Sequence, residues 1–392
     1  MSDFDVIVVG GGLIGASIAF ELACGKRRVL LLDRQEPGRE ASWAAAGMLS
    51  PGPDAPDAQS LVPLAKKSLE LYPDFVAAVE EASAEKVAFA REGTLEVFHG
   101  ADAEARRDSF LAQYAELGIA GESLTLDSAL AMEPALNPKA GAAAWIPGEA
   151  TVDPRALTEA TLRAAQSKGV EIRGNCAVSS LLIRNGRCSG VLAKEQISSD
   201  HVVIAAGAFC AEIGEATRES AIGLSRYAPT HPVRGQMMAV RSKSVLLKKV
   251  LRSDAGYIVP RPDGRIVCGS TLENAGFEKA TTSEGLKRIH AAAVSLAPGL
   301  GNAEIVEIWA GLRPGSPDHL PIIGPTDIAG LLIATGHYRN GILLAPVTAK
   351  LIQEWIVEGS TSMDVEKFSP MRFAANTSRG VAFGTSISSV HS

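Results

Sequence analysis

The pattern of apolar positions is most regular at the start of the chain, where two continuous apolar runs flank a helical one. Residues 5–9, DVIVV, form a β-branched run typical of a strand buried on both faces. Residues 13–24 repeat apolar side chains at helical spacing, and residues 29–32, VLLL, form a second apolar run. This order predicts a strand, a helix and a second strand, the unit from which α/β folds with a parallel sheet are built.

Three glycines occupy the turn between the first strand and the helix. Gly10, Gly12 and Gly15 have the spacing G-x-G-x-x-G, and the second strand ends at Asp33. In dinucleotide-binding units the first glycine allows a tight turn, the second lets the backbone approach a pyrophosphate, and the third lets helix and strand pack closely. The helix N-terminus favours phosphate, while Asp33 can accept hydrogen bonds from ribose hydroxyls and disfavours a 2′-phosphate. The stretch predicts a dinucleotide site and leaves NAD and FAD as alternatives.

Helical and strand patterns alternate along the rest of the chain. Further helices are predicted at Leu61 to Glu81 (interrupted near Pro73), Ala103 to Leu117, Arg155 to Ser167, Ser283 to Leu296 and Ile342 to Val357. Further strands are predicted at Gly93 to Phe98, Val170 to Ile172, Val178 to Ile183, His201 to Ala208, Val233 to Val240, Gly256 to Val259 and Ile266 to Gly269. Asn185 and Gly186 predict a hairpin turn, and Asp153 with Pro154 predicts a capped helix start.

This alternation predicts an α/β (α+β overall) protein of two interleaved domains. A Rossmann-like nucleotide-binding domain would comprise residues 1–50, 150–220 and 325–360. A substrate-binding domain, built on a mixed and largely antiparallel sheet, would comprise residues 51–149 and 221–324. A chain of 392 residues with 46% hydrophobic content is long enough for two cores. Residues 374–392, which are rich in Ser, Gly and Ala, are expected to be a disordered tail.

Composition narrows the classes of function and site. The net charge of −6 disfavours nucleic acid and anionic membranes as partners. No apolar run approaches the roughly 20 residues of a spanning helix, and the first strand begins close to Met1, so we expect a soluble cytoplasmic protein without membrane insertion. The seven histidines form no metal-binding motif. Reduced, buried thiols are expected because the cysteines form no C-x-x-C: Cys24, Cys176, Cys188, Cys210 and Cys268.

Two further stretches contain small residues beside polar ones. Residues 40–49, EASWAAAGML, would let the backbone lie flat against a large ligand, and Ser42 could bond a phosphate. An ordinary alanine-rich helix start is the alternative. Residues 309–315, WAGLRPG, place Arg313 between residues that permit a sharp backbone path, which would hold the guanidinium in one place. A surface salt bridge is the alternative for Arg313.

The last informative stretch, residues 331–346, predicts a strand, a turn and a helix. The N-terminus of the helix that begins at Ile342 points at whatever the turn surrounds, and it can stabilise negative charge. A reduced flavin develops such charge at its N1 and C2 carbonyl region. His337 and Arg339 lie in this turn, where a purely structural role is the alternative.

Together these stretches resemble the D-amino acid oxidase superfamily of FAD enzymes, and within it the glycine oxidase branch, which is associated with thiamine biosynthesis. The most specific motif is GHYRNGILLAP at residues 336–346, followed by WAGLRPG at 309–315, with support from SWAAAGML at 42–49 and GYIVP at 256–260. The match extends to about Phe373. No cysteine lies in these glycine-rich turns, so the FAD is expected to be non-covalent.

The resemblance implies a set of site residues. Tyr257, Arg313 and Arg339 would surround the substrate, with Arg313 as the fork that binds the carboxylate. Leu272 would stand where the best-known glycine oxidases place a methionine beside the flavin. FAD would be bound by Gly10, Gly12, Leu13, Ile14, Gly15, Asp33, Arg34, Ser42, Ala45, Ala46, Gly47, Met48, Val178, Gly207, His337, Tyr338, Arg339, Asn340, Gly341, Ile342 and Leu343.

The implied activity is oxidative deamination of glycine and other small amino acids, such as sarcosine and small D-amino acids. Oxygen would be the electron acceptor, the products would be the oxo acid, ammonia and hydrogen peroxide, and the protein would be a homo-oligomer. One alternative is a flavin dehydrogenase that uses another acceptor. A second is a non-catalytic flavoprotein subunit, against which the presence of Tyr257 and Arg313 argues.

Overall fold

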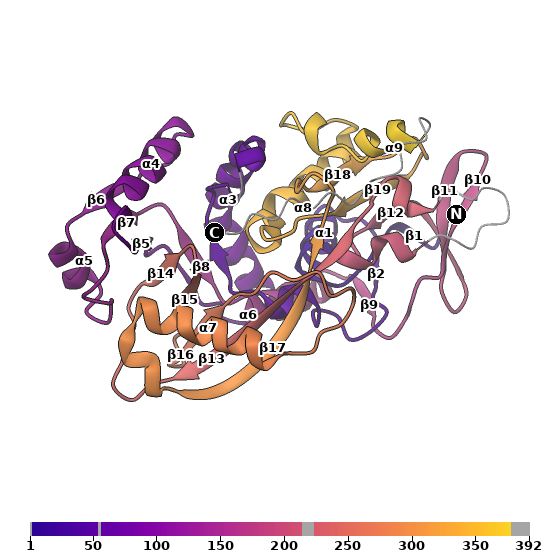
Figure 1. Cartoon of the computed structure of the whole chain (residues 1–392). Helices are drawn as coiled ribbons and strands as arrows, with labels where there is room; N and C mark the ends of the chain where they lie inside the picture. Colours follow the sequence, from indigo (N-terminus) through magenta and orange to yellow (C-terminus); the bar gives the residue numbers. More distant parts are fainter. Residues whose placement is uncertain (1, 54–55, 214–222, 378–392) are drawn as a thin grey trace.

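Two eight-stranded sheets organise the part of the chain that this computed structural model describes, residues 2–53, 56–213 and 223–377. In Figure 1 the strands of the first sheet lie on the right and those of the second sheet on the left. A small third sheet contains β3 (Met48–Leu49), β8 (Ala150–Val152) and β4 (Phe89–Ala90), in that order. Residues far apart in the sequence therefore meet between the two large sheets.

The first sheet has a parallel centre. Val8 of β1 pairs with Leu31 of β2 on one side and with Val203 of β12 on the other. β9 continues the parallel part beyond β2, and β19 does so beyond β12, whereas β10, β11 and β18 are antiparallel to their neighbours. The strands are β1 (Phe4–Val9), β2 (Val29–Leu32), β9 (Glu171–Arg173), β10 (Ser180–Arg184), β11 (Arg187–Leu192), β12 (Gln196–Ile204), β18 (Ile322–Pro325) and β19 (Leu331–Thr335).

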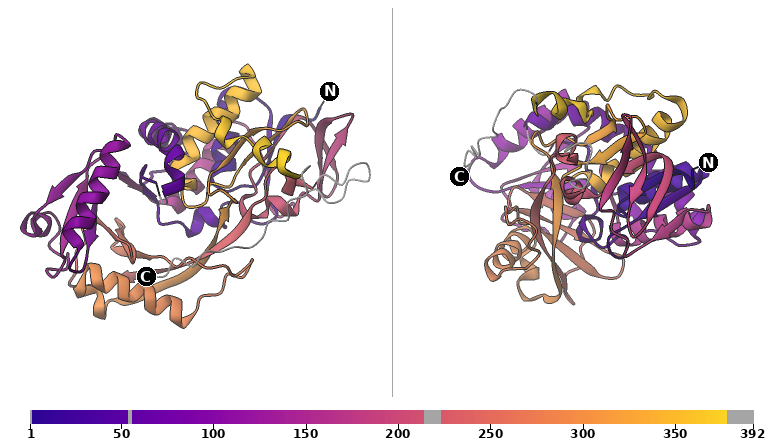
Figure 2. Two further views of the ribbon diagram at one scale, coloured as in Figure 1. Left: turned by 45° about the horizontal axis from the view of Figure 1, so that its top comes forward. Right: turned by 90° about the vertical axis from the view of Figure 1, so that its right-hand side faces the viewer.

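Helices cover one face of this sheet. Successive residues of a strand point to opposite faces, so each strand contributes side chains to two different cores. Val6, Val8 and Leu31 face a core that they share with α1, α3, α6 and α8, while Ile7 and Leu30 face a second core on the other side. Figure 2 shows this group of helices beside the sheet. The bounds of the helices are α1 (Leu13–Cys24), α3 (Val62–Ser83), α6 (Pro154–Ser167) and α8 (Gly341–Glu358).

The second sheet is antiparallel except for the parallel pair β5 and β14. Its order is β17-β13-β16-β15-β14-β5-β7-β6. Met238 and Ile258 share a core with α7 (Ser283–Leu296), while Met237 and Tyr257 face the opposite side. The strands are β5 (Thr94–Phe98), β6 (Glu122–Leu124), β7 (Ala142–Ile146), β13 (His231–Arg241), β14 (Val250–Ser253), β15 (Gly256–Pro260), β16 (Arg265–Gly269) and β17 (Glu304–Gly315).

Shorter elements complete the described chain. Figure 1 shows α4 and α5 at the end of the molecule opposite the hairpin of β10 and β11. The α-helices are α2 (Ala41–Ala44), α4 (Ala103–Glu116), α5 (Leu126–Met132) and α9 (Met371–Thr377). The 3-10 helices are η1 (Pro56–Leu61), η2 (Gly207–Glu212), η3 (Leu224–Arg226), η4 (Pro298–Asn302) and η5 (Glu366–Phe368).

The α/β prediction is confirmed, and several elements match it closely. Helices α1 and α7 have the predicted bounds. Asp153 caps α6, since its Oδ1 accepts hydrogen bonds from the N–H groups of Arg155 and Ala156. The β10–β11 hairpin turns at Asn185 and Gly186, whose φ angles of 49° and 72° are the positive values that such a turn requires.

Three predictions differ from the structure in helix and chain-end regions. Helix α3 continues through Pro73 without a break, because the apolar face on either side of it is buried. Residues 374–377 of the predicted tail lie in α9, and residues 378–392 lie outside the described residues. Cys24 is exposed at the end of α1, whereas the other four free cysteines are buried as predicted.

The division into two domains stays a proposal, with one change. Helix α3 falls in the range 51–149, which was assigned to the substrate-binding domain. It packs instead on α6 and α8 and shares the core of the first sheet. Its Ser68 and Tyr72 hydroxyls donate hydrogen bonds to the carbonyls of Leu343 and Ile342 at the start of α8. We therefore propose that α3 belongs to the first domain.

Candidate active site

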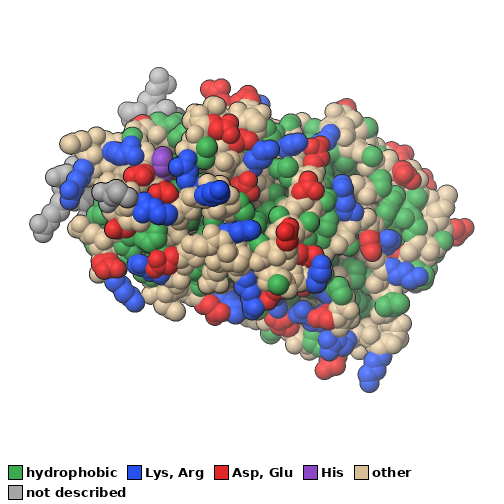
Figure 3. All heavy atoms as spheres, turned by 180° about the vertical axis from the view of Figure 1, so that it is seen from behind, with side chains coloured by type: hydrophobic (Ala, Val, Ile, Leu, Met, Phe, Trp, Pro, Cys, Tyr) green, Lys and Arg blue, Asp and Glu red, His purple; other side chains and the backbone are tan. Residues whose placement is uncertain are grey.

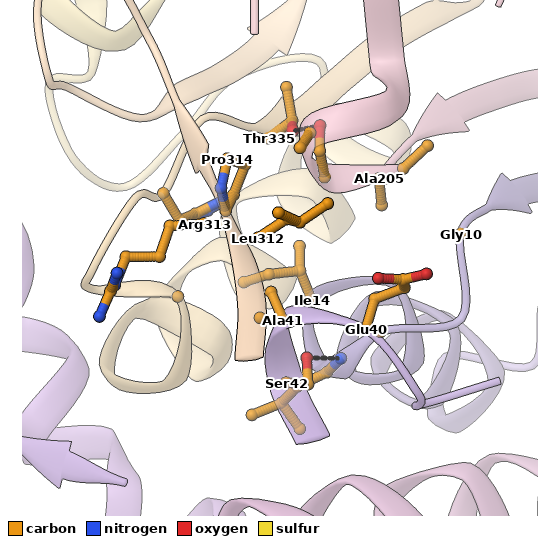
Figure 4. A pocket seen from close by; sticks show the side chains of 18 of the residues that line it. Gly10, Ile14, Glu40, Ala41, Ser42, Ala205, Leu312, Arg313, Pro314 and Thr335 are labelled. Carbon is orange, nitrogen blue, oxygen red and sulfur yellow. Dashed lines mark hydrogen bonds between the residues drawn. The ribbon is translucent and has the colours of Figure 1, made fainter. Parts of the chain in front are cut away.

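A cavity of about 460 Å³ lies between the two sheets. Its walls include the carboxyl ends of β1, β2, β12 and β19, which is where ligands bind in open α/β sheets. The second sheet contributes residues of β13, β15 and β17. Figure 4 shows Gly10, Ser42 and Arg313 around this space, each from a different part of the chain. The volume is in the ordinary range of small-molecule and cofactor sites.

The glycine turn at the start of α1 has the geometry that a dinucleotide requires. Gly10 has φ of +110°, and a Cβ there would lie 2.4 Å from the carbonyl oxygen of Ala205. A Cβ on Gly15 would lie 1.9 Å from the carbonyl oxygen of Gly10, so this glycine permits close packing of helix and strand. A Cβ on Gly12 would meet only Ser42 Oγ, at 3.3 Å. The backbone at Gly12 is therefore open to a ligand in the cavity.

The N-terminus of α1 is suited to an anion. Its first turn contains no acidic residue, and its N-cap residue makes no side-chain hydrogen bond. Ser42 Oγ accepts a hydrogen bond of 2.9 Å from the N–H of Leu13, which is the dashed contact at Ser42 in Figure 4. This contact joins the glycine turn to residues 41–48, which comprise α2 and the residues after it and are called the α2 turn below. The helix dipole at this end of α1 favours negative charge such as that of a pyrophosphate.

Asp33 lies at the end of β2 and lines the same cavity. Its Oδ2 accepts a hydrogen bond from the N–H of Gly11 at 2.7 Å, and its Oδ1 accepts one from the N–H of Gln35 at 2.9 Å. Burial raises the pKa of the Asp33 carboxyl, and these two backbone bonds oppose that rise. Each carboxylate oxygen retains acceptor capacity for a ribose hydroxyl. This is the end of the cavity where the adenosine half of a dinucleotide would lie.

A second helix N-terminus opens on the same cavity. Gly341 and Ile342, the first residues of α8, line the cavity, and the first turn of α8 has no acidic residue and no side-chain cap. The two helix ends therefore fit a ligand that carries negative charge at two separate places. A dinucleotide pyrophosphate and the N1–C2 region of a reduced flavin meet that description.

Side chains of the second sheet and its loops fix the backbone of the α2 turn by hydrogen bonds. Trp309 Nε1 donates a hydrogen bond of 3.0 Å to the carbonyl of Ala44, and Arg261 Nη2 donates one of 2.5 Å to the carbonyl of Ala46. Gly47 has φ of +75°, and a Cβ there would lie 2.0 Å from the carbonyl oxygen of Val152. The small side chains of this turn therefore form a fixed wall of the cavity. Residues 41–44 form the short helix α2, so the alternative of a helix start also holds for part of this stretch.

The wall from the second sheet contains the candidate substrate residues. Arg313 Nη1 donates to the carbonyl of Thr271 at 3.2 Å, and Nη2 donates to Ser270 Oγ at 2.7 Å. The guanidinium lies against the backbone of Gly235, where a Cβ would come within 2.1 Å of Nη1. Tyr257 is buried in the same wall. The fixed guanidinium arises from these contacts and not from a sharp backbone path, since Arg313 lies within the extended strand β17.

His337 lines the cavity but is held as a structural group. It is buried, and its Nε2 lies 3.0 Å from Thr348 Oγ1 of α8. Burial lowers the pKa of His337 from its usual 6.5 to about 3. The imidazole is therefore neutral near pH 7.

This depressed pKa predicts how stability depends on pH. Below pH ~6.5 the unfolded chain binds a proton at His337, whereas the folded chain does not bind it until about pH 3. Acidification between these two values should therefore lower the free energy of unfolding by about 1.4 kcal/mol for each pH unit. His337→Gln keeps a polar partner for Thr348 and removes the titration. When the pH falls from about 7 to about 5, the Tm of the wild type should decrease more than the Tm of the variant. Equal losses in both proteins would contradict this prediction.

Most of the predicted site residues line the cavity, with four exceptions. Those that line it are Gly10, Gly12, Leu13, Ile14, Asp33, Arg34, Ser42, Ala45, Ala46, Gly47, Met48, Val178, Gly207, Tyr257, Arg313, His337, Tyr338, Arg339, Gly341 and Ile342. Gly15, Asn340 and Leu343 do not line it, and Arg339, which does, is exposed. Leu272, which was expected beside the flavin, is 60% exposed and does not line the cavity.

Other lining residues were not predicted. Gly235 and Met237 come from β13, Phe209 comes from η2, and Glu40 precedes α2. For Met237 the only indication in the sequence was the alternating strand pattern of β13. That pattern does not predict which face of the strand contacts a ligand. Cys176, which lies outside the glycine-rich turns, also lines the cavity, and its N–H donates a hydrogen bond to the carbonyl of Asp33.

The described residues contain neither a membrane-spanning helix nor a metal cluster. None of the described helices combines the length and the apolar character needed to cross a membrane. Within residues 2–53, 56–213 and 223–377, no cluster of three or more His, Cys, Asp or Glu side chains could hold a metal ion. On the face shown in Figure 3, basic and acidic side chains are interspersed.

Comparison with known proteins gives a consistent result. The model of the family described as DAO, FAD dependent oxidoreductase, matches residues 5–355. The chain is 33% identical over 368 residues to "Glycine oxidase" of Pseudomonas putida, covering 93% of this chain and 98% of the relative. It is 34% identical over 382 residues to "Bifunctional protein ThiO/ThiG" of Trichormus variabilis, covering 95% of this chain but only 56% of that relative. The chain therefore spans about half the length of such bifunctional relatives.

The solved structures agree. The crystal structure of glycine oxidase from Geobacillus kaustophilus superimposes with a TM-score of 0.87 at 31% identity, and the match covers 95% of this chain and 99% of that chain. The chain belongs to the DAO family of FAD dependent oxidoreductases.

Proposed function

We propose that this FAD dependent oxidoreductase oxidises glycine and other small amino acids, including sarcosine and small D-amino acids, with oxygen as the acceptor. The observation that carries the proposal is the fixed guanidinium of Arg313 in the wall of the FAD cavity. A planar guanidinium binds a carboxylate through two parallel hydrogen bonds and so fixes its orientation. Relatives named glycine oxidase at about one-third identity support the substrate class.

Positioning is the main contribution of the chain to this chemistry. Ser270 Oγ and the Thr271 carbonyl each take one N–H of Arg313, which leaves three of its five donors for a substrate carboxylate. With the carboxylate held, the Cα–H and the amine have one orientation toward the α2 turn and α8. Holding the reacting groups in this way makes the reaction step effectively intramolecular.

No side chain of the facing wall is suited to remove a proton from carbon. The residues that β13, β15 and β17 contribute to the cavity are Gly235, Met237, Tyr257, Gly311, Leu312, Arg313 and Pro314. This set includes no carboxylate and no imidazole. We therefore propose that the hydrogen on Cα leaves with its electron pair as hydride, and that the amine lone pair forms the C=N bond of the imine. Bound FAD supplies the two-electron acceptor for this step. Hydrolysis of the imine then gives the oxo acid and ammonia.

We further propose a link to thiamine biosynthesis, a cytoplasmic location and a homo-oligomeric state. The resemblance to the glycine oxidase branch and the relatives named ThiO/ThiG support the first of these. Because the chain spans only part of those relatives, the remainder of their function is not carried over. Light scattering on the purified protein tests the oligomeric state.

A peroxide assay across a substrate panel tests the proposed activity. Purified protein with bound flavin is mixed with glycine, sarcosine, D-alanine and D-proline, and with the L forms of the last two. We expect peroxide from glycine and sarcosine, in amounts equal to the substrate consumed. Substrate consumption without peroxide, restored by an artificial electron acceptor, would identify a dehydrogenase. No turnover of any compound by the yellow protein would contradict the enzymatic proposal.

The flavin should be held without a covalent bond. Cys176 is the cysteine that lines the cavity, and the hydrogen bond of its backbone to Asp33 places it at the adenosine end. Heat or acid precipitation should therefore release intact FAD into the supernatant, measured by its fluorescence. Flavin that stays with the precipitated chain would contradict this expectation. Cys176→Ser, analysed in parallel, would then show whether that thiol is the attachment point.

A further inference from the structure

The segment between β16 and α7 joins the second sheet to the adenosine end of the FAD cavity. Figure 1 labels β16 and α7, the two elements that it connects. The ring of Phe277 in this segment stacks on the ring of Phe209, with the centroids 4.9 Å apart and the planes 26° apart. The other partner of Phe209 is the guanidinium of Arg34, whose Cζ lies 3.4 Å from the ring centroid. Phe209 and Arg34 both line the cavity.

A second contact of the segment reaches the same end of the cavity. Lys279 Nζ lies 3.3 Å and 3.2 Å from the two carboxylate oxygens of Glu40. Glu40 Oε1 also accepts hydrogen bonds from Gln35 Nε2 at 2.8 Å and from Arg34 Nη2 at 3.2 Å. Glu40 lines the cavity, and Arg34 directly follows Asp33. Two separate contacts therefore connect the segment to the wall that surrounds the adenosine position.

Both ends of the segment are fixed to the second sheet. Glu273 accepts hydrogen bonds from Arg234 Nε at 2.6 Å and from Gln236 Nε2 at 2.7 Å. At the other end Thr282 donates its N–H to Gln236 Oε1 at 2.7 Å and caps α7 through Gly285. The middle of the segment has a longer contact with the sheet, an ion pair of 3.9 Å between Arg234 Nη1 of β13 and Glu278 Oε2. The side chain of Phe277 is 44% exposed, and its ring stacks on that of Phe209.

We propose that residues 274–279 form a clasp that retains FAD by bracing the adenosine wall of the cavity. The clasp ties η2, through Phe209, and the loop before α2, through Glu40, to the second sheet. FAD can leave at this end only when these parts of the wall separate, and separation breaks the stacking contact and the ion pair. The proposal rests on the FAD site of the family and is independent of which substrate the enzyme oxidises.

The clasp predicts the rate at which FAD leaves the holoenzyme. Stacked aromatic pairs and exposed ion pairs differ in strength and in their response to salt. Phe277→Ala should speed FAD release about tenfold, and Lys279→Gln about twofold to threefold. Salt at about 0.5 M should speed release from the wild type more than from Lys279→Gln, because the variant lacks the exposed Lys279–Glu40 pair and keeps only the pairs of Arg34 with Glu40 and Glu212 at this wall. Phe277→Leu keeps an apolar side chain and should lie between the wild type and Phe277→Ala.

The test measures the fluorescence of FAD released after dilution of the holoenzyme. Leu246→Ala is the matched control, since Leu246 is 77% exposed on the loop between β13 and β14 and does not line the cavity. Its FAD release should equal that of the wild type. At saturating FAD, kcat should be unchanged in Phe277→Ala and Lys279→Gln. Thermal unfolding and circular dichroism identify a misfolded Phe277→Ala, in which case Phe277→Leu and Lys279→Gln decide.

Two outcomes would overturn the clasp. One is FAD release from Phe277→Ala within about twofold of the wild type, since the broken stack would then not limit release. The other is an equal salt dependence in the wild type and Lys279→Gln. Peroxide formation plays no part in either result, so failure of the clasp and failure of the proposed oxidase activity remain distinguishable.

Discussion

Arg313→Ala should lower kcat/KM for glycine by at least about 30-fold while the FAD content stays close to that of the wild type. Removing one partner of a desolvated charge pair costs about 2 to 5 kcal/mol, and the substrate carboxylate would lose its only positioned guanidinium in the wall from the second sheet. Arg313→Lys keeps the charge but not the planar fork, so it should recover only part of the loss. Steady-state kinetics with FAD quantified in each preparation measure both effects.

Two controls separate binding of the carboxylate from other roles of Arg313. Amines without a carboxylate should respond little to either substitution, since they do not use the fork. Ser270→Ala removes one acceptor of the guanidinium but leaves the Thr271 carbonyl, and its loss of kcat/KM should be smaller than that of Arg313→Ala. If Arg313→Ala instead loses FAD while activity per bound flavin stays normal, Arg313 is a cofactor or structural residue.

Gly12→Val should give a folded protein that purifies without colour. The Cβ position of Gly12 meets only Ser42 Oγ, at 3.3 Å, so the chain can accommodate a side chain that then points at the pyrophosphate position. Gly10 and Gly15 differ, because a Cβ at either collides with backbone within 2.4 Å and so would disturb the fold itself. The ratio of flavin absorbance to protein absorbance, together with circular dichroism, measures the two effects separately.

Gly301→Val is the matched control for the added side chain. Gly301 lies in the exposed η4 segment, where a Cβ would meet nothing within 4 Å. This variant should remain as yellow as the wild type. A yellow Gly12→Val with normal FAD affinity would show that the glycine turn does not contact the pyrophosphate.

Local sequence signals predicted the backbone geometry of the glycine turn well. The G-x-G-x-x-G spacing requires particular backbone positions, and the structure has Gly10 at positive φ and Gly15 in contact with the preceding turn. The capped start of α6 at Asp153 was readable for the same reason, since capping involves only neighbouring residues. Features set by a few consecutive residues are therefore accessible without a structure.

Contacts made across the fold were less accessible. Phe209 and Met237 line the cavity, yet neither carries a chemical signal that distinguishes it from a core residue. The position of α3 depends on the apolar face that it presents to α6 and α8, and that packing also keeps the helix continuous at Pro73. For Arg313 the sequence predicted a fixed guanidinium from a sharp backbone path, and that path is absent from the structure. Its guanidinium is fixed by Ser270 and Thr271 on a neighbouring segment, whereas the backbone around it is an ordinary strand.

Anaerobic mixing of the yellow protein with glycine tests the proposed oxidation most directly. Without oxygen the electrons taken from the substrate stay on the cofactor, so the visible absorption of oxidised flavin should fall with each addition of glycine and return when air is admitted. The same experiment with Arg313→Ala should need far higher glycine concentrations. Absorption that stays unchanged with glycine, sarcosine and D-alanine, in a protein that carries a full complement of FAD, would contradict the proposal that this site oxidises small amino acids.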